Sequence, residues 1–223
     1  GEVRLAIDWF EGQVLDKAWN MGFKNYFPKT KKIGYRPTES FPLYLSSYPI
    51  PIEREAHVIP DVMALQGKGT VFTVKEFLPN LDTIVIPSFK SQYVWKFKEN
   101  KLSQSKYMVL VTLPISINYS ILLIKRLLSA CNAIPIKGMA IELLIKPHPA
   151  QSLSKIKNNL PELPDYISLT EEKSFPKLLY STNILITEAS STCLEAMACG
   201  ISVIMMENEE GLTYDPIPRR VSE

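Results

Sequence analysis

Hydrophobic and polar residues alternate along this chain with two different periods, and the change of period predicts its elements. In the second half, short runs of consecutive apolar and β-branched residues are typical of strands buried on both faces of a sheet. These runs cover residues 107–113, 139–145, 165–169, 183–187 and 201–206. The segments between them place apolar residues at helical spacing. They cover residues 119–128, 151–160, 174–181 and 190–200. Strand and helix therefore alternate, which predicts an α/β fold with a parallel, doubly wound sheet.

The first half shows the same alternation less regularly. The strands predicted there are 3–7, 31–35, 61–67 and 83–87, and the helices are 12–23 and 70–78. Many of the 17 prolines lie between Pro28 and Pro60. Proline removes a backbone donor and restricts the residue before it, so this stretch is expected to form loops and short strands.

A change in composition divides the chain. Residues 96–106 (KFKENKLSQSK) are polar and basic and have no apolar period, which indicates a solvated linker. The predicted domains are therefore 1–95 and 107–223, with the linker 96–106 between them. Residues 1–95 lack the opening strands of such a domain, so the chain is expected to be a fragment of a longer protein.

Composition excludes several classes of protein. Apolar residues make up 46% of the 223 residues and charged residues 22%, which argues against disorder, collagen and coiled coil. The net charge of +2 gives no reason to expect a nucleic-acid partner. Three cysteines cannot form a disulfide framework and favour reduced thiols, hence a cytoplasmic protein. The apolar runs are too short, or too charged, to span a membrane, and the first residues do not have the pattern of a signal peptide.

Ligands of open α/β sheets bind beyond the carboxyl ends of the strands, where three segments here carry polar groups. These are residues 113–116, 146–149 and 187–192. In the last segment, Ser190, Ser191 and Thr192 begin a helix, where hydroxyls and backbone N–H groups suit an anion such as phosphate. The alternative is that one of these hydroxyls only caps the helix.

Glu195 follows Ser191 at i, i+4 spacing and so faces the same way on the helix. A carboxylate there could accept hydrogen bonds from vicinal hydroxyls, as ribose-binding acids do in dinucleotide folds. The alternative is an ordinary solvent-exposed helix carboxylate.

His148 lies between two prolines directly after a predicted buried strand. A partly protonated imidazole, or the neighbouring Lys146, could donate to a phosphate or sugar oxygen. The alternative is a turn residue without a binding role. No cluster has the spacing of metal ligands, and Cys193 and Cys199 are expected in the core, so no metal is expected. Glycine-rich phosphate loops are also missing, which argues against standard NAD and ATP sites.

Three motifs of the second half together resemble those of a known enzyme family. The loop KPHP (146–149), the stretch TEASSTCLEAMACGISVI (187–204) and GLTYDP (211–216) resemble the nucleotide-sugar half of GT-B glycosyltransferases. The resemblance implies a fold of two Rossmann-like domains, the first one incomplete. It implies that Ser190, Ser191 and Thr192 hold the donor phosphates, that Glu195 holds ribose or sugar hydroxyls, and that His148 contacts the phosphate or the leaving nucleotide.

A narrower resemblance is to bacterial sialyltransferases and polysialyltransferases of GT-B type, whose HP and SS/T motifs are similar to His148-Pro149 and Ser190-Ser191. Their acidic pair before glycine is half present, with Glu11 before Gly12 and Asp8 close by. Residues 1–95 resemble the later part of an acceptor-side domain. That implies a cleft-facing loop in which Asp8 or Glu11 deprotonates an acceptor hydroxyl. The alternative for Asp8 is the N-cap of the helix that begins near Glu11.

The expected function is a metal-independent glycosyltransferase of bacterial surface-polysaccharide or lipopolysaccharide synthesis. Its donor would be a nucleotide sugar, bound as substrate, so no cofactor is expected. Its acceptor would be a glycan or a lipid-linked acceptor, and association with the inner face of the membrane stays open. The alternatives are a CMP-sialic acid or CMP-Kdo type transferase, a nucleotide-sugar epimerase-like enzyme, and a non-catalytic nucleotide-binding module.

Overall fold

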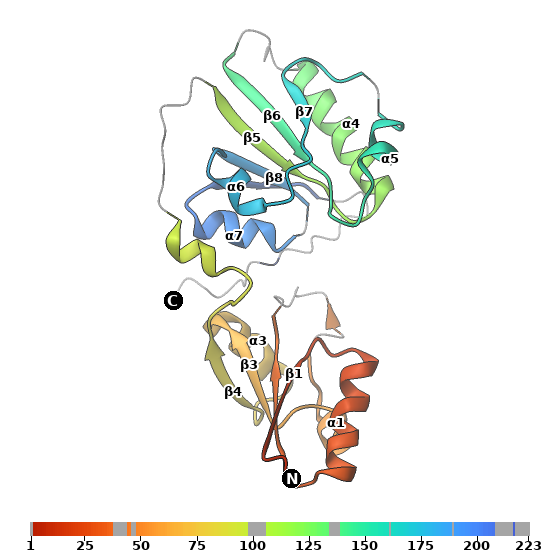
Figure 1. The fold of residues 1–223 in the computed structure, drawn as a ribbon, viewed down its shortest axis with the longest axis vertical. Helices are drawn as coiled ribbons and strands as arrows, with labels where there is room; N and C mark the ends of the chain where they lie inside the picture. The colour runs from red at the N-terminus through yellow and green to blue at the C-terminus, as the bar shows by residue number, and fades with distance from the viewer. Residues whose placement is uncertain are drawn as a thin grey trace. The chain divides into compact units, whose positions relative to one another are not determined.

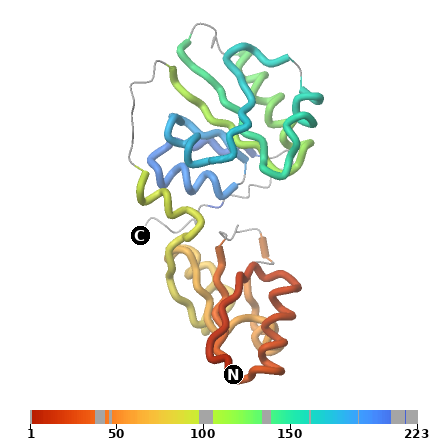
Figure 2. Tube along the Cα trace, viewed as in Figure 1, coloured from red at the N-terminus to blue at the C-terminus, as the bar shows by residue number. Residues whose placement is uncertain are grey.

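The structure is a computed structural model of the 223-residue chain. It describes residues 2–37, 44–45, 48–97, 106–133, 139–160, 162–188, 190–207 and 216. Two compact units are present: unit 1 contains the described residues up to Gln92 together with Pro216, and unit 2 those from Tyr93 to Glu207. In Figure 2, unit 1 runs from red to yellow and unit 2 from yellow-green to blue.

The described part of unit 1 is a four-stranded parallel sheet in the order β1-β2-β3-β4, with its helices packed on one face (Figure 1). Its elements are β1 (Leu5–Trp9), α1 (Val14–Tyr26), β2 (Lys31–Tyr35), α2 (Pro51–Glu55), β3 (Val62–Gln66), α3 (Gly67–Phe77) and β4 (Asp82–Ile86). Each crossover moves one strand further in the same direction, and right-handed crossovers of that kind put their helices on the same side. Met63 and Leu65 on β3 pack there against Val74 on α3.

The opposite face of the unit 1 sheet is apolar and is exposed at its edge strands β1 and β4, whereas Val62 and Ala64 of β3 on the same face are buried. Ile7 is 63% exposed and Trp9 59% exposed, and both point to this face from β1. Ile84, which lies on the same face of β4, is also exposed. Among the described residues of unit 1, the apolar side chains left exposed on this face therefore belong to the two edge strands of the sheet.

The described part of unit 2 is a five-stranded parallel sheet in the order β7-β6-β5-β8-β9. Its elements are the 3₁₀ helix η2 (Gln92–Lys96), β5 (Tyr107–Thr112), α4 (Ile117–Ala133), β6 (Ile141–Lys146), α5 (Leu153–Lys157), β7 (Ile167–Leu169), α6 (Phe175–Leu179), β8 (Ile184–Thr187), α7 (Thr192–Ala198) and β9 (Ser202–Met205). The sheet has a core on each face. Val111 and Ile145 pack against α4 and α5 on one face, whereas Leu110 and Leu185 pack against α6 and α7 on the other. The predicted doubly wound parallel sheet is confirmed.

Some predicted boundaries differ from the observed ones. Helix α4 runs on to Ala133, because Cys131 continues its buried stripe one turn beyond Leu127. Helix α5 ends at Lys157, short of the predicted residue 160, and the Asn159 side chain donates instead to the carbonyl of Lys155. The proline-rich stretch contains the helix α2, which Pro51 begins at a position where its missing N–H costs nothing.

The segment that follows unit 1 packs on unit 2. Tyr93, Val94 and Phe97 lie against the core beneath α6 and α7, and the Phe97 ring stacks on Tyr180 with centroids 4.7 Å apart. Most of the predicted linker, residues 98–105, lies outside the described residues, as does 208–215 with most of the GLTYDP motif. The predicted division into 1–95, 96–106 and 107–223 stays a proposal.

Candidate functional site

The strands β5 and β8 enclose the topological switch point of unit 2. The crossover from β5 leads to β6 on one side, whereas β8 leads to β9 on the other. Ligands of open α/β sheets bind at the carboxyl ends of such strands. Thr112, the last residue of β5, is in register with Lys146 on β6 and with Thr187 on β8. The three segments predicted to carry the chemistry therefore begin side by side at one edge of the sheet.

A network of hydroxyl groups lies at this switch point. The Thr112 Oγ1 donates to Thr187 Oγ1 at 2.8 Å, and both side chains are buried. Thr112 Oγ1 also lies 3.5 Å from Thr192 Oγ1, which donates to Ser190 Oγ at 3.0 Å. Thr112 has no part in the sequence motifs. Its signal in the sequence is a polar residue at the end of an otherwise apolar strand.

The start of α7 is built by the three predicted hydroxyl residues. Ser191 is the N-cap, and its carbonyl accepts from the backbone N–H of Leu194. The Ser190 Oγ accepts from the backbone N–H of Thr192 at 3.3 Å. The hydroxyl of Ser190, one residue before the N-cap, therefore satisfies one of the free N–H groups at the start of the helix. Among the described residues, no hydrogen bond of the Ser191 hydroxyl is found. Gly200 follows the helix with φ 75°, the left-handed conformation of a helix C-terminal glycine.

Lys146 ends β6 beside Thr112. Its Nζ donates to the backbone carbonyl of Glu172 at 3.1 Å, which holds the ammonium group at the edge of the sheet. Burial lowers the pKa of Lys146, and the Glu172 carboxylate opposes that shift. The side chain is partly buried, so its charge is less screened than a surface charge.

His148 follows in the loop after β6, and its Nδ1 accepts from the backbone N–H of Ala150 at 3.1 Å. This bond requires an unprotonated Nδ1, so the ring proton lies on Nε2. Burial, and then the charge of Lys146, lower the pKa of His148 below 6.5. Where the sequence leads us to expect a partly protonated imidazole, the structure favours a neutral ring with an Nε2–H donor.

A glutamine outside the predicted set joins the loops after β5 and β6. Gln151 Nε2 donates to the carbonyl of Ile115 at 2.9 Å and to Ser120 Oγ at 3.1 Å. Ser120, on α4, is fully buried and donates to the carbonyl of Ser116. These bonds hold the two loops next to each other at the switch-point edge.

Glu195 lies one turn into α7 and is partly buried. Its Oε2 accepts a hydrogen bond of 2.5 Å from Tyr93 Oη, a residue that sequence reasoning did not connect with the site. Glu188, directly after β8, is a second residue missed as a site candidate. Burial raises its pKa, and the positive charge of Arg126 opposes the shift.

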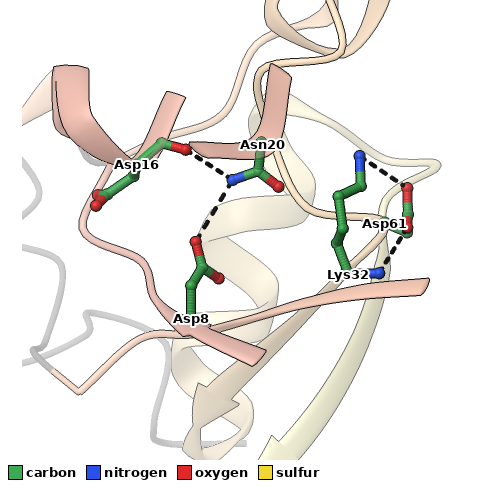
Figure 3. Close-up of polar contacts among 5 residues, drawn as sticks. All are labelled: Asp8, Asp16, Asn20, Lys32 and Asp61. Carbon is green, nitrogen blue, oxygen red and sulfur yellow. Dashed lines mark hydrogen bonds and ion pairs between the residues drawn. The ribbon is translucent and has the colours of Figure 1, made fainter. Parts of the chain in front are cut away.

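In unit 1, Asp8 points from β1 toward α1 (Figure 3). Asn20 Nδ2 lies 3.5 Å from Asp8 Oδ2 and donates to the carbonyl of Asp16 at 2.9 Å. The Oδ1 atoms of Asp8 and Asn20 are buried and have no hydrogen-bond partner among the described residues. Burial, and then the charge of Asp16, raise the pKa of Asp8 from 3.8 to about 6, against the lowering effect of Asn20 and Lys32.

Asp8 does not cap α1; the N-cap is Gln13. The Asp16 carboxylate accepts from the backbone N–H groups of Glu11 and Gln13 at 2.9 and 3.0 Å. The same close-up shows Lys32 bonded twice to Asp61, through its backbone N–H at 2.8 Å and its Nζ at 3.4 Å (Figure 3). The start of α1 is therefore held by Asp16, and Asp8 lies against Asn20 of the same helix.

Glu11 lies in the loop after β1, and both of its carboxylate oxygens accept hydrogen bonds. Trp9 Nε1 donates to Oε1 at 2.9 Å, and Gln13 Nε2 donates to Oε2 at 3.2 Å. Trp9 also contacts the Tyr35 ring edge-on, with centroids 5.8 Å apart. Glu11 is thus oriented and partly accessible at the carboxyl edge of the unit 1 sheet.

Arg36 follows β2 at the same edge and is 2% exposed. Burial lowers its pKa to about 10, whereas Tyr48 and Glu11 favour the charged form. The guanidinium remains charged at neutral pH, so this edge combines a fixed carboxylate with a buried cation.

Within the described ranges, no group of His, Cys, Asp and Glu side chains is arranged to hold a metal ion. Cys131, Cys193 and Cys199 are buried thiols in the core of unit 2. None of the helices that the structure describes is both long and apolar enough to span a bilayer.

No protein-family model and no curated protein matches the chain. Solved structures are similar in fold. The glycotransferase of kitacinnamycin aligns with a TM-score of 0.56 at 12% identity, over 93% of this chain and 57% of that chain. The MnaA–UDP co-structure of S. aureus aligns at 0.53 and 13% identity, over 95% of this chain and 65% of that one. Acinetobacter baumannii MurG aligns at 0.50 and 8% identity, over 93% and 53%.

The chain therefore spans less than two-thirds of the length of these structures. The likeness concerns the fold: the two parallel sheets are Rossmann-like domains of GT-B type.

Proposed function

We propose that this chain is the whole or part of a glycosyltransferase that moves a sugar from a nucleotide-activated donor to an acceptor hydroxyl. The observation that carries the proposal is the hydroxyl network Thr187–Thr112–Thr192–Ser190 beside Lys146 at the switch point of unit 2. Hydroxyl donors and a cation at this edge suit the phosphates of a nucleotide. The UDP named for the MnaA structure and the glycotransferase named for the kitacinnamycin structure support the same ligand class.

On the donor side, Ser190, Ser191 and Thr192 are proposed to hold the phosphates and Glu195 the ribose or sugar hydroxyls. The acceptor oxygen forms a bond to the anomeric carbon, while the bond from that carbon to the phosphate oxygen breaks. Negative charge then develops on the leaving nucleotide. Lys146 and the Nε2–H of His148 are proposed to stabilise this charge, so the proposed reaction requires no metal ion.

On the acceptor side, we assign the general base to Glu11. The acceptor hydroxyl loses its proton to this carboxylate as the new bond forms. Asp8 is the other candidate, but its side chain points at Asn20 beneath α1 and its Oδ1 is buried. Glu11 is partly accessible and is oriented by Trp9 and Gln13. Asp8 is proposed to act on Glu11 through the position of α1.

We further propose an acceptor and a biological role for this transfer. The acceptor would be a glycan or a lipid-linked acceptor in the synthesis of a bacterial surface polysaccharide, in the cytoplasm or at the inner face of the membrane. A sialyl or Kdo transferase that uses a CMP donor is the narrower alternative within the same class.

The proposal is tested first by binding. UDP, CMP, GDP and CDP are titrated against the folded chain by calorimetry and by thermal unfolding, where a ligand at 100 Kd adds about 2.7 kcal/mol of stability. We expect one nucleotide to bind and Lys146→Met to weaken it about tenfold or more. Lys125→Met, which removes an exposed lysine on α4, is the matched control and leaves binding unchanged. Absence of binding by all four nucleotides to the folded protein would contradict the proposal.

Transfer is tested with the nucleotide sugar that this scan selects, in the longest chain that shows turnover. We expect Glu11→Gln to lower kcat by about 100-fold or more with little change in nucleotide affinity. Glu55→Gln, an exposed carboxylate on α2, is the control. Interconversion of the donor sugar without an acceptor would indicate the epimerase-like alternative, and binding without any turnover would indicate the non-catalytic module.

A further inference from the structure

Tyr93 binds the carboxylate of Glu195 across a sequence separation of 102 residues. Its Oη donates to Oε2 at 2.5 Å, which is short for a hydrogen bond and typical of a charge-assisted one. Both side chains are partly buried, so water does not compete fully for the two groups. The bond belongs to unit 2 and lies one turn along α7 from the hydroxyl residues at its start.

The position of the Tyr93 ring is fixed by the packing of η2. Tyr93, Val94 and Phe97 lie against the core beneath α6 and α7, and the Phe97 ring stacks on Tyr180. The tyrosine therefore brings its hydroxyl to Glu195 from an element that is packed on the core of unit 2. Burial, and then the bond to Glu195, raise the pKa of Tyr93, so that its hydroxyl keeps its proton at working pH.

This contact gives the two oxygens of Glu195 different roles. Oε2 is occupied by Tyr93, whereas Oε1 accepts no hydrogen bond from the residues that the structure describes. A carboxylate held at one oxygen presents the other oxygen in a fixed direction. The side chain then loses less conformational entropy when a ligand binds.

We propose that Tyr93 is a positioning residue that holds Glu195 so that its Oε1 accepts hydrogen bonds from the ribose hydroxyls of the donor nucleotide. The inference rests on the proposed function. Because Tyr93 lies in the segment that joins the two units in sequence, it also makes the nucleotide site dependent on the packing of that segment.

The experiment measures ribose discrimination in Tyr93→Phe, Glu195→Gln and the double variant. UDP, CMP, GDP and CDP are titrated by calorimetry, each beside its 2′-deoxy form. We expect the wild-type chain to prefer the ribonucleotide about tenfold, as loss of a hydrogen bond to a charged group predicts. Tyr93→Phe reduces this preference to threefold or less, with a small effect on the 2′-deoxy form. The double variant has the same preference for the ribonucleotide as Glu195→Gln, because both changes remove the same interaction.

Two controls separate positioning from folding. Tyr180→Phe removes the hydroxyl of an exposed tyrosine whose ring stacks on Phe97, and we expect it to keep the wild-type preference. Urea unfolding of Tyr93→Phe verifies that the chain is folded at the temperature of the titration.

Three other results of the titrations would contradict the role proposed for Tyr93. Equal weakening of the ribo and 2′-deoxy forms in Tyr93→Phe overturns the inference and leaves the bond a packing contact. Tighter binding by Tyr93→Phe also overturns it, because the tyrosine would then occupy the place of a ligand hydroxyl. Lack of binding by every nucleotide to the wild-type chain contradicts the proposed function itself, and the inference with it.

Discussion

Thr112 donates a hydrogen bond of 2.8 Å to Thr187, its direct partner across the parallel strands β5 and β8. Both hydroxyls are buried at the point where the crossovers of the sheet diverge. A buried polar pair has to be satisfied internally, since each hydroxyl has given up its contact with water. The pair thus fixes the relative position of the two strand ends on which the proposed donor site is built.

Removal of one of these hydroxyls should destabilise unit 2. Thr112→Val leaves the Thr187 hydroxyl without its buried partner, and we expect a loss of about 1–3 kcal/mol in the free energy of unfolding. Thr187→Val should act in the same direction. The double variant should lose less than the sum of the two, because neither hydroxyl is then left unsatisfied. Urea denaturation of the four proteins measures the cycle, and strict additivity would contradict a direct bond.

Asp8 should make the stability of unit 1 depend on pH. Its pKa of about 6 in the folded state lies above 3.8, so the folded state holds the proton more tightly. The stabilisation from this group is fully present below pH 3.8 and is lost as the pH rises through 6. Asp8→Asn should therefore be more stable than the wild type at pH 7. Its free energy of unfolding, measured with urea, should be higher by about 1–2 kcal/mol after allowance for solvent screening.

The advantage of Asp8→Asn should shrink as the pH falls from 7 toward 4, where the wild-type carboxyl becomes protonated as well. Asp82→Asn is a control of the same chemistry in unit 1, at an exposed carboxylate on β4. A stability difference for Asp8→Asn that is constant over this range would be inconsistent with a raised pKa.

His148 should titrate below 6.5 because burial and Lys146 both disfavour the imidazolium. Its stabilising bond from Ala150 N–H is present above pH 6.5 and is lost as the pH falls through the folded pKa, since protonated Nδ1 cannot accept. Imidazole resonances recorded against pH by NMR give the midpoint, and His57→Gln assigns the two histidines. In Lys146→Met the midpoint should move up toward 6.5. An unchanged midpoint would mean that Lys146 does not act on the ring.

Two glycines should respond to alanine in opposite directions. At Gly34 on β2, an added Cβ would lie 2.6 Å from Pro60 Cγ and 2.9 Å from Phe10 Cβ. Gly34→Ala should lose about 1–3 kcal/mol through overpacking. At Gly22 in α1, an added Cβ meets nothing within 4 Å, so Gly22→Ala should gain about 0.5–1 kcal/mol from helix propensity. Thermal and urea unfolding compare the two, and a neutral Gly34→Ala would contradict the close packing of β2.

Much of unit 2 could be predicted from the sequence because its signals are local. The buried strands at 107–112 and 184–187 show as apolar runs, and Gly200 marks the end of α7. The edge at which Lys146 and Ser190 lie follows from the rule that parallel strands end on the same side. These inferences need only residue order and period.

Other features could not be predicted, because they depend on pairs of residues far apart in the chain. Tyr93 and Glu195 lie 102 residues apart, and nothing in the sequence links them. The orientation of Asp8 toward Asn20, rather than toward the edge of the sheet, follows from the face of β1 that α1 covers. A strand pattern fixes which residues share a face but not which face is covered.

The sequence by itself determined the alternation of strands and helices, the doubly wound class of the second sheet, and the segments that end at its ligand-binding edge. The reason is that burial imposes a period on each element separately. Only the tertiary structure decided that Thr112 joins the Thr187 and Thr192 hydroxyls and that the Nδ1 of His148 accepts from a backbone N–H. It also decided that Asp8 points at Asn20 with its Oδ1 buried. Strand order, burial and charge at these positions result from packing between distant segments, which no local pattern encodes.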